Sequence, residues 1–147
     1  MDESFEKSSS EVAVALEASL ALDGDGFRIA HARHHAADFL TYVKDHYGVP
    51  VAAATVHIVQ LIVSELVTNT LKYASGPALL RLRITGPVVQ VELHDSNPAA
   101  PSAVTPDPLR VGQHGLAIVA ALARTLTVEA TSHGKRIVAD VVLDPAA

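Results

Sequence analysis

The spacing of apolar residues changes from a helical period to a strand period near residues 75–77, and this change constrains the fold more than any other feature. Before it, apolar residues recur every three or four positions over residues 27–47 and again over 51–74, which predicts two helices. After it, residues 79–85 and 88–95 alternate apolar and polar side chains, which predicts two strands joined by a turn at Gly86-Pro87. A two-residue turn places Arg83 opposite Gln90 and Arg81 opposite Glu92.

The rest of the chain adds strands and one helix. We expect a strand within residues 12–22, ended by the turn signal DGDG at 23–26, and a proline-rich loop over 96–111. A helix over 115–124 and the strands TLTVEAT and RIVADVVL, joined by a turn at SHGK, follow. This order predicts an α+β fold: a two-layer α/β sandwich with a mixed, mostly antiparallel sheet and helices on one face. Residues 1–10 are expected to be a disordered tail, and residues 11–147 a single domain.

Composition limits the functional classes. The chain has 147 residues, of which 49% are hydrophobic and 4% aromatic, so the core should be aliphatic. A net charge of −5 with scattered Lys and Arg argues against direct nucleic-acid binding. No uninterrupted apolar run approaches the roughly 20 residues of a membrane span, and there is no cysteine. The polar, acidic stretch MDESFEKSSSE is not expected to act as a secretory signal, because it has no apolar segment. We therefore expect a cytoplasmic protein without a membrane segment, whose partners are proteins or small molecules.

The stretch SELVTNTLKYA, residues 64–74, carries a polar line on an apolar helix. Glu65, Asn69 and Lys72 are spaced i, i+4 and i+7, and therefore lie on one side. A different stripe can serve the core; it consists of Val56, Val59, Val63, Leu66 and Thr70. Two interpretations remain open for the polar line: a helix edge that faces water, or part of a binding site.

The stretch LHDSNP, residues 93–98, ends an apolar stripe with a carboxylate. Counting by twos from Val91 and Leu93 brings Asp95 onto the same sheet face. A charge on a core face is costly unless it has a partner. The alternative is that Asp95 turns outward at the strand end and caps the following turn.

The stretch GQHGLAIVAALA, residues 112–123, places glycines directly before an apolar helix. Free backbone N–H groups and the helix dipole make such a start a potential anion site, although glycine is also an ordinary loop residue. The long loop before it is either a cover over a ligand or a linker.

The three stretches, in this order, resemble the N, G1 and G2 boxes of the ATP-binding domain shared by DNA gyrase, histidine kinases and MutL (the GHKL superfamily). The chain is more closely similar to the single-domain anti-sigma factors and serine-protein kinases of the RsbW and SpoIIAB type, over residues 27–143. The closing GKRIVADVVL is similar to the final hairpin of that family. The resemblance implies the histidine-kinase-like ATPase, or Bergerat, fold.

The resemblance also implies roles for individual residues. In the N box, Asn69 would coordinate Mg²⁺ through its amide oxygen, Glu65 would be the catalytic base for γ-phosphoryl transfer, and Lys72 would lie near phosphate. Asp95 would accept a hydrogen bond from the adenine amino group. The other implied ATP-binding residues are Asn97, Arg110 in the lid, Gly112, His114, Gly115 and Leu116, the last of which would begin the helix behind the phosphates.

Three departures from the family pattern bear on these roles. Ser96-Asn97-Pro98 follows Asp95 where the wider superfamily has glycines, a form that is common in the single-domain branch. Gln113 stands where a second glycine is usual, which affects the backbone geometry on the phosphate side. Gly134-Lys135 is followed by Arg136, so it is not part of a phosphate-binding P-loop, and turn chemistry is the expected explanation.

The resemblance implies that the protein is an anti-sigma factor. Such a protein sequesters a sigma factor and phosphorylates a serine or threonine on a STAS-type anti-anti-sigma protein, with ATP and Mg²⁺, commonly as a homodimer. The alternative is a nucleotide-binding interaction module with little kinase activity; a third interpretation is an α+β domain that binds no nucleotide. Separately, His31 and His35 share a helix face near His34, which could bind zinc or simply face water.

Overall fold

The computed structural model describes residues 16–22, 29–73, 77–96 and 113–146. Three helices lie in this part of the chain: α3 (Ile29–Tyr47), α4 (Ala53–Tyr73) and α5 (Gln113–Leu122). Five strands accompany them: β1 (Glu17–Leu22), β2 (Ala78–Thr85), β3 (Val88–Asp95), β4 (Thr125–Thr131) and β5 (Gly134–Val142). The expected tail at 1–10 and the turn at 23–26 lie outside the described residues.

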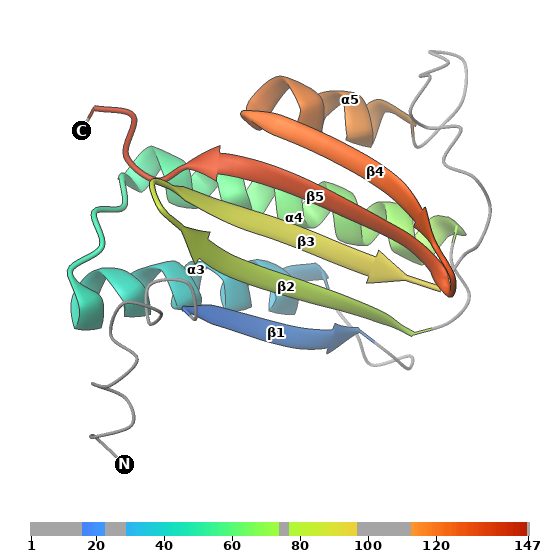
Figure 1. Ribbon diagram of the computed structural model, residues 1–147, viewed down its shortest axis with the longest axis horizontal. Coiled ribbons are helices and arrows are strands. Elements are labelled where there is room, and N and C mark those ends of the chain that lie inside the picture. Colours follow the sequence, from blue (N-terminus) through green and yellow to red (C-terminus); the bar gives the residue numbers. More distant parts are fainter. Residues whose placement is uncertain (1–15, 23–28, 74–76, 97–112, 147) are drawn as a thin grey trace.

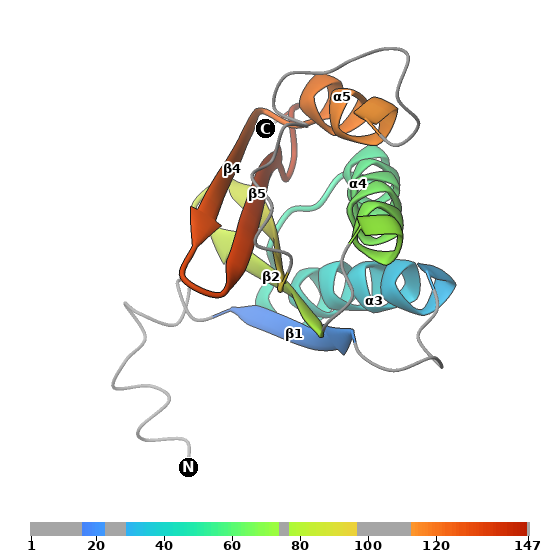
Figure 2. The same cartoon turned by 90° about the vertical axis from the view of Figure 1, so that its right-hand side faces the viewer.

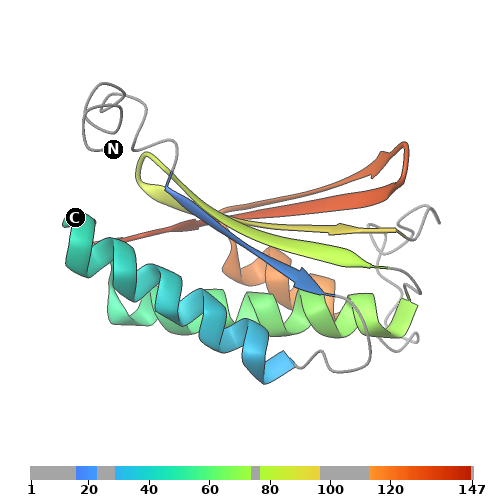
Figure 3. The same ribbon diagram turned by 90° about the horizontal axis from the view of Figure 1, so that it is seen from below.

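The strands form one sheet in the order β1-β2-β3-β5-β4. All four pairings within the described sheet are antiparallel, whereas the sequence had suggested a partly mixed sheet. The three helices pack on one face of this sheet, as Figure 1 and the view from below in Figure 3 show. The end-on view in Figure 2 shows the resulting two layers. The predicted α+β sandwich with helices on one face is therefore confirmed.

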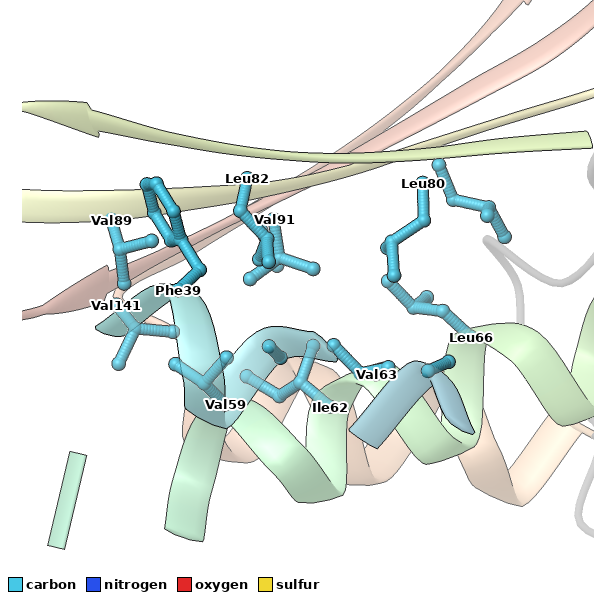
Figure 4. Packing of buried hydrophobic residues seen from close by; sticks show 14 of the residues in the cluster. Phe39, Val59, Ile62, Val63, Leu66, Leu80, Leu82, Val89, Val91 and Val141 are labelled. Atoms are coloured by element: carbon cyan, nitrogen blue, oxygen red, sulfur yellow. The ribbon is translucent and has the colours of Figure 1, made fainter. Parts of the chain in front are cut away.

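The core lies between these layers and is almost entirely aliphatic. From α4, Val59, Ile62, Val63 and Leu66 are fully enclosed. Figure 4 shows these side chains facing those of the central strands. The strand residues that meet them are Leu80, Leu82, Val89, Val91, Leu93, Ile137 and Val141. The predicted core stripe of α4 is thus confirmed for Val59, Val63, Leu66 and Thr70, while Val56 is only partly buried.

The register of the first hairpin agrees with its prediction. Arg83 pairs with Gln90 and Arg81 with Glu92, across a turn at residues 86–87. Gly86 adopts a positive φ of 56°, a conformation that glycine accepts without steric cost.

Two boundaries differ from their predictions. Helix α5 begins at Gln113 rather than at residue 115, and it ends at Leu122. Strand β5 begins at Gly134, because Thr131 pairs with Gly134 and leaves only Ser132-His133 as the turn. Lys135 is therefore a strand residue, and its assignment to a turn was wrong.

The face of the sheet opposite the helices carries an ion-pair network around Glu92. This carboxylate is 3% exposed and accepts hydrogen bonds from Arg81, His94 and Arg136. Arg136 also contacts Glu129 on β4. Burial alone would raise the pKa of Glu92, but the hydrogen bonds from Arg136, His94 and Arg81 outweigh it and lower the pKa to about 2. The network therefore links five side chains across β2, β3, β5 and β4.

Helix α4 meets the length and hydropathy of a membrane span over Ala53–Lys72. Core helices of water-soluble proteins meet the same criteria, and nearly half of this segment is buried against the sheet and the other helices. This packing accounts for the apolar residues on the inward face of α4, whereas Leu61 and Leu71 on the same helix are exposed.

Candidate functional site

The polar line on α4 is not a solvated helix edge. Asn69 is only 8% exposed, Glu65 is half-buried, and only Lys72, in the last turn, is exposed. An amide enclosed in mid-helix is unfavourable unless it meets a polar partner or a ligand. The burial of Asn69 therefore supports the interpretation of this line as part of a site.

Glu65 lies directly against the start of α5. A Cβ atom added to Gly115 would come within 2.8 Å of the Oε1 atom of Glu65. The absence of a side chain at Gly115 therefore lets the carboxylate of Glu65 approach the backbone of α5. The N-box and G2-box stretches, 50 residues apart in the sequence, are in contact.

The first turn of α5 begins at Gln113 and includes Gly115 and Leu116. Its backbone N–H groups have no partners within the helix, so they and the dipole favour an anion in front of them. Gly115 is thus inside the first turn rather than before the helix. Leu116 was expected to begin the helix; instead it is buried in the core and anchors this turn.

Asp95 lies at the end of β3 on the face that meets the helices. It is 6% exposed, and its carboxylate forms an ion pair with Lys135, with 2.9 Å between Oδ2 and Nζ. The two residues are direct cross-strand neighbours on β3 and β5. The alternative in which Asp95 turns outward and caps a turn is therefore wrong.

Lys135 is the site residue that the sequence analysis missed. A signal existed: counting back by twos from the buried Ile137 brings Lys135 onto the inward face of β5. That count depends on where β5 begins, and the Gly-Lys pair was attributed to the turn instead.

These parts lie at one end of the sandwich. Figure 1 shows the last turns of α4, the end of β3 and the start of α5 towards the same end of the molecule, and the close approach of Gly115 to Glu65 agrees with this. Asn97, Arg110 and Gly112 lie outside the described residues, as does the side chain of His114, whose backbone belongs to α5. Their predicted roles stay predictions.

The histidines of α3 do not assemble a metal site with other described residues. His31 and His34 are exposed, and within the described ranges no group of three His, Asp or Glu side chains comes together. His35 is half-buried in a groove of about 440 Å³ between β1 and α3. Burial lowers its pKa, the neighbouring His31 lowers it further, and Asp38 opposes them.

A comparison with protein families matches residues 27–140 to the histidine kinase-like ATPase domain. The match covers more than half of the chain and includes all three motif stretches. The chain belongs to this family. The family is that of ATPase domains, and the fold described above is the histidine-kinase-like fold that the sequence predicted.

This ATPase domain is also similar to a solved structure, the histidine kinase domain from the Erythrobacter litoralis EL346 blue-light activated histidine kinase. The two share 18% identity at a TM-score of 0.48, over 80% of this chain and 62% of the other. The present chain thus spans less than two thirds of that structure. A comparison with curated proteins finds no match.

The residues of this ATPase domain fit a magnesium-bound nucleotide. Asn69 has the kind of amide oxygen that Mg²⁺ accepts as a ligand, and the first turn of α5 offers N–H groups to which phosphates could bind. The carboxylate of Glu65 borders the space that a Cβ on Gly115 would fill. An acidic side chain therefore lies beside the first turn of α5, where an anion could bind. This arrangement suits phosphoryl transfer.

Proposed function

We propose that this ATPase domain binds Mg²⁺-ATP and acts as an anti-sigma factor with serine/threonine kinase activity. The observation that carries the kinase part is the contact between Glu65 and the first turn of α5, with Asn69 enclosed one helical turn further along. A carboxylate beside a phosphate-binding helix start is placed to receive a proton while a hydroxyl attacks the γ-phosphate.

In this proposal, each step is assigned to particular groups of the chain. The N–H groups of the α5 first turn bind phosphate oxygens, and Asn69 offers its amide oxygen to the metal. Glu65 takes the proton from the attacking hydroxyl, and the buried Asp95 accepts a hydrogen bond from the adenine amino group. Mg²⁺, when bound, neutralises the charge that develops on the phosphates.

The proposed partners are a sigma factor and a STAS-type anti-anti-sigma protein, and the proposed state is a cytoplasmic homodimer. The similarity of the three motifs to the single-domain RsbW and SpoIIAB branch supports this choice. The negative net charge supports protein partners rather than nucleic acid. Direct contact with a membrane is not part of the proposal.

The kinase proposal is tested with labelled ATP, Mg²⁺ and a candidate anti-anti-sigma protein. Glu65→Ala is expected to abolish phosphate transfer while ATP affinity stays within a few-fold, because the carboxylate acts on the proton rather than on the nucleotide. The matched control is His57→Ala, an exposed change on the same helix, which should transfer phosphate at the parent rate. Full activity of Glu65→Ala would contradict the role of Glu65 as base.

The second candidate function is a nucleotide-binding interaction module with little kinase activity. Gln113 favours it, because the sequence has glutamine at the first residue of α5, where the family that the motifs resemble commonly has glycine. Nucleotide binding without transfer to any anti-anti-sigma protein, in the parent as in Glu65→Ala, would favour this second function.

A further inference from the structure

The ammonium group of Lys135 lies where an apolar stripe would be expected to continue. The other inward-facing residues of β5 are Ile137, Ala139 and Val141, which follow Lys135 in the strand and are all buried. Lys135 shares their face and is 7% exposed, and its ion pair with Asp95 joins the ends of two neighbouring strands. The base-binding carboxylate proposed above therefore has a cation fixed beside it.

Stability alone does not explain this pair. Removing two charges from water is expensive, and a pair of apolar side chains of similar size is often at least as stabilising. The backbone adds a second constraint: any Cβ at Gly134 would overlap the carbonyl group of Asp95, so β5 lies tightly against the end of β3. The backbone segments that carry Lys135 and Asp95 are thus held close together.

A carboxylate next to an ammonium group presents an acceptor beside a donor. Adenine presents the complementary pattern on its Watson–Crick edge, where the amino group is a donor and the adjacent N1 is an acceptor. A carboxylate has about four acceptor positions on its two oxygens, so Asp95 can keep its ion pair with Lys135 while it accepts a hydrogen bond from the amino group. The ammonium group has three N–H donors, so Lys135 can serve Asp95 and the base together.

We propose that Lys135 is a second base-recognition residue, which donates a hydrogen bond to N1 of adenine while Asp95 accepts one from the amino group. This inference rests on the proposed nucleotide-binding function and deepens it. Lys135 then has two roles: it neutralises the charge of the buried Asp95, and it recognises N1 of adenine, the atom next to the carbon that carries the amino group.

The test measures nucleotide affinity by titration calorimetry for the parent and Lys135→Met. Methionine is similar in length to lysine but cannot donate a hydrogen bond. The probes are ATP and 1-deaza-ATP, in which a C–H group replaces N1. The parent should bind ATP about tenfold or more tightly than 1-deaza-ATP, the usual range for a hydrogen bond to a charged group. Lys135→Met should lose most of this preference.

A general loss of affinity would look different. If Lys135→Met weakens ATP and 1-deaza-ATP equally, or if the parent binds both equally well, Lys135 does not read N1 and the inference is overturned. Tighter ATP binding by Lys135→Met would also overturn it, because Lys135 would then compete with the base for Asp95. No binding of either nucleotide by the folded parent would refute the proposed function itself.

Lys135→Met removes the ion-pair partner of the buried Asp95 and could therefore prevent the protein from folding, which thermal unfolding by circular dichroism would reveal. A second variant covers this case. Lys135→Arg keeps a cation beside Asp95 but displaces the donor, since the guanidinium group is larger and planar. It should fold and should show a reduced preference for ATP over 1-deaza-ATP. An undiminished preference for ATP over 1-deaza-ATP in a folded Lys135→Arg would contradict a positioned ammonium donor.

GTP is a further probe, and tighter binding of GTP than of ATP by the parent would overturn the assignment of adenine.

Discussion

Replacing Glu92 with Gln removes the charge at the centre of the network on the open sheet face. In the folded protein, Arg81, His94 and Arg136 all donate to this carboxylate, which is 3% exposed. The variant leaves these donors facing one another across a neutral amide. We therefore expect Glu92→Gln to lower the free energy of unfolding at neutral pH without changing the fold.

The magnitude follows from the pKa of Glu92, which falls from 4.5 to about 2 on folding. At about 1.4 kcal/mol for each unit of pKa, the full shift corresponds to about 3 kcal/mol. The partners Arg81, His94 and Arg136 are about one-third exposed, so solvent screening reduces this contribution. We expect Glu92→Gln to lose about 2 kcal/mol at pH 7.

The sign of the pH dependence is fixed by the direction of the shift. Because the folded-state pKa is the lower one, the stabilisation is present above pH 4.5 and is lost as the pH falls from 4.5 towards 2. The difference between parent and Glu92→Gln should therefore shrink over this interval. Taking the difference cancels the titration of the other carboxylates.

Urea denaturation at pH 7, 5, 4 and 3, followed by circular dichroism, measures this difference. The control is Glu129→Gln, which removes an exposed partner of Arg136 on the same network and should stay within about 0.5 kcal/mol of the parent. A loss below about 0.5 kcal/mol for Glu92→Gln at pH 7, or a difference that does not change with pH, would refute the reasoning.

Two glycine substitutions test the close approaches at the site. Gly134→Ala should destabilise the protein by about 2 kcal/mol or more in urea denaturation, because the new Cβ overlaps backbone of Asp95 that cannot move aside; parent-like stability would show that β5 can shift. Gly115→Ala should instead keep or slightly raise the stability, since alanine favours a helix and only the flexible end of Glu65 must move. Its phosphate transfer should fall with that movement, and unchanged transfer would argue against a positioned Glu65.

The pairing between sequence neighbours could be predicted, because it depends on local patterns. Alternation over residues 79–95 with a two-residue turn was sufficient to place Arg81 opposite Glu92. The neighbours β3 and β5 could not be paired in the same way, since the residues between them carry no information about register. This non-local pairing is what brings Lys135 beside Asp95.

The parts of the site differ in how far the sequence determined them. The period of α4 placed Glu65 and Asn69 on one side, but only the packing of α4 within the fold shows that Asn69 is enclosed. The start of α5 was misplaced because Gln113 and His114 are compatible with either loop or helix. The burial of Glu92 was likewise hidden, since alternation assigns it to the open face and the neighbouring side chains cover it.

The most direct test of the central claim is the binding of ATP by the parent protein, by Asn69→Ala and by Asp95→Asn, measured by calorimetry with and without Mg²⁺. The parent should bind ATP more tightly with Mg²⁺ than without it. Asn69→Ala should lose this dependence on the metal, and Asp95→Asn should weaken binding with and without the metal. Failure of the folded parent to bind ATP under either condition would contradict the account.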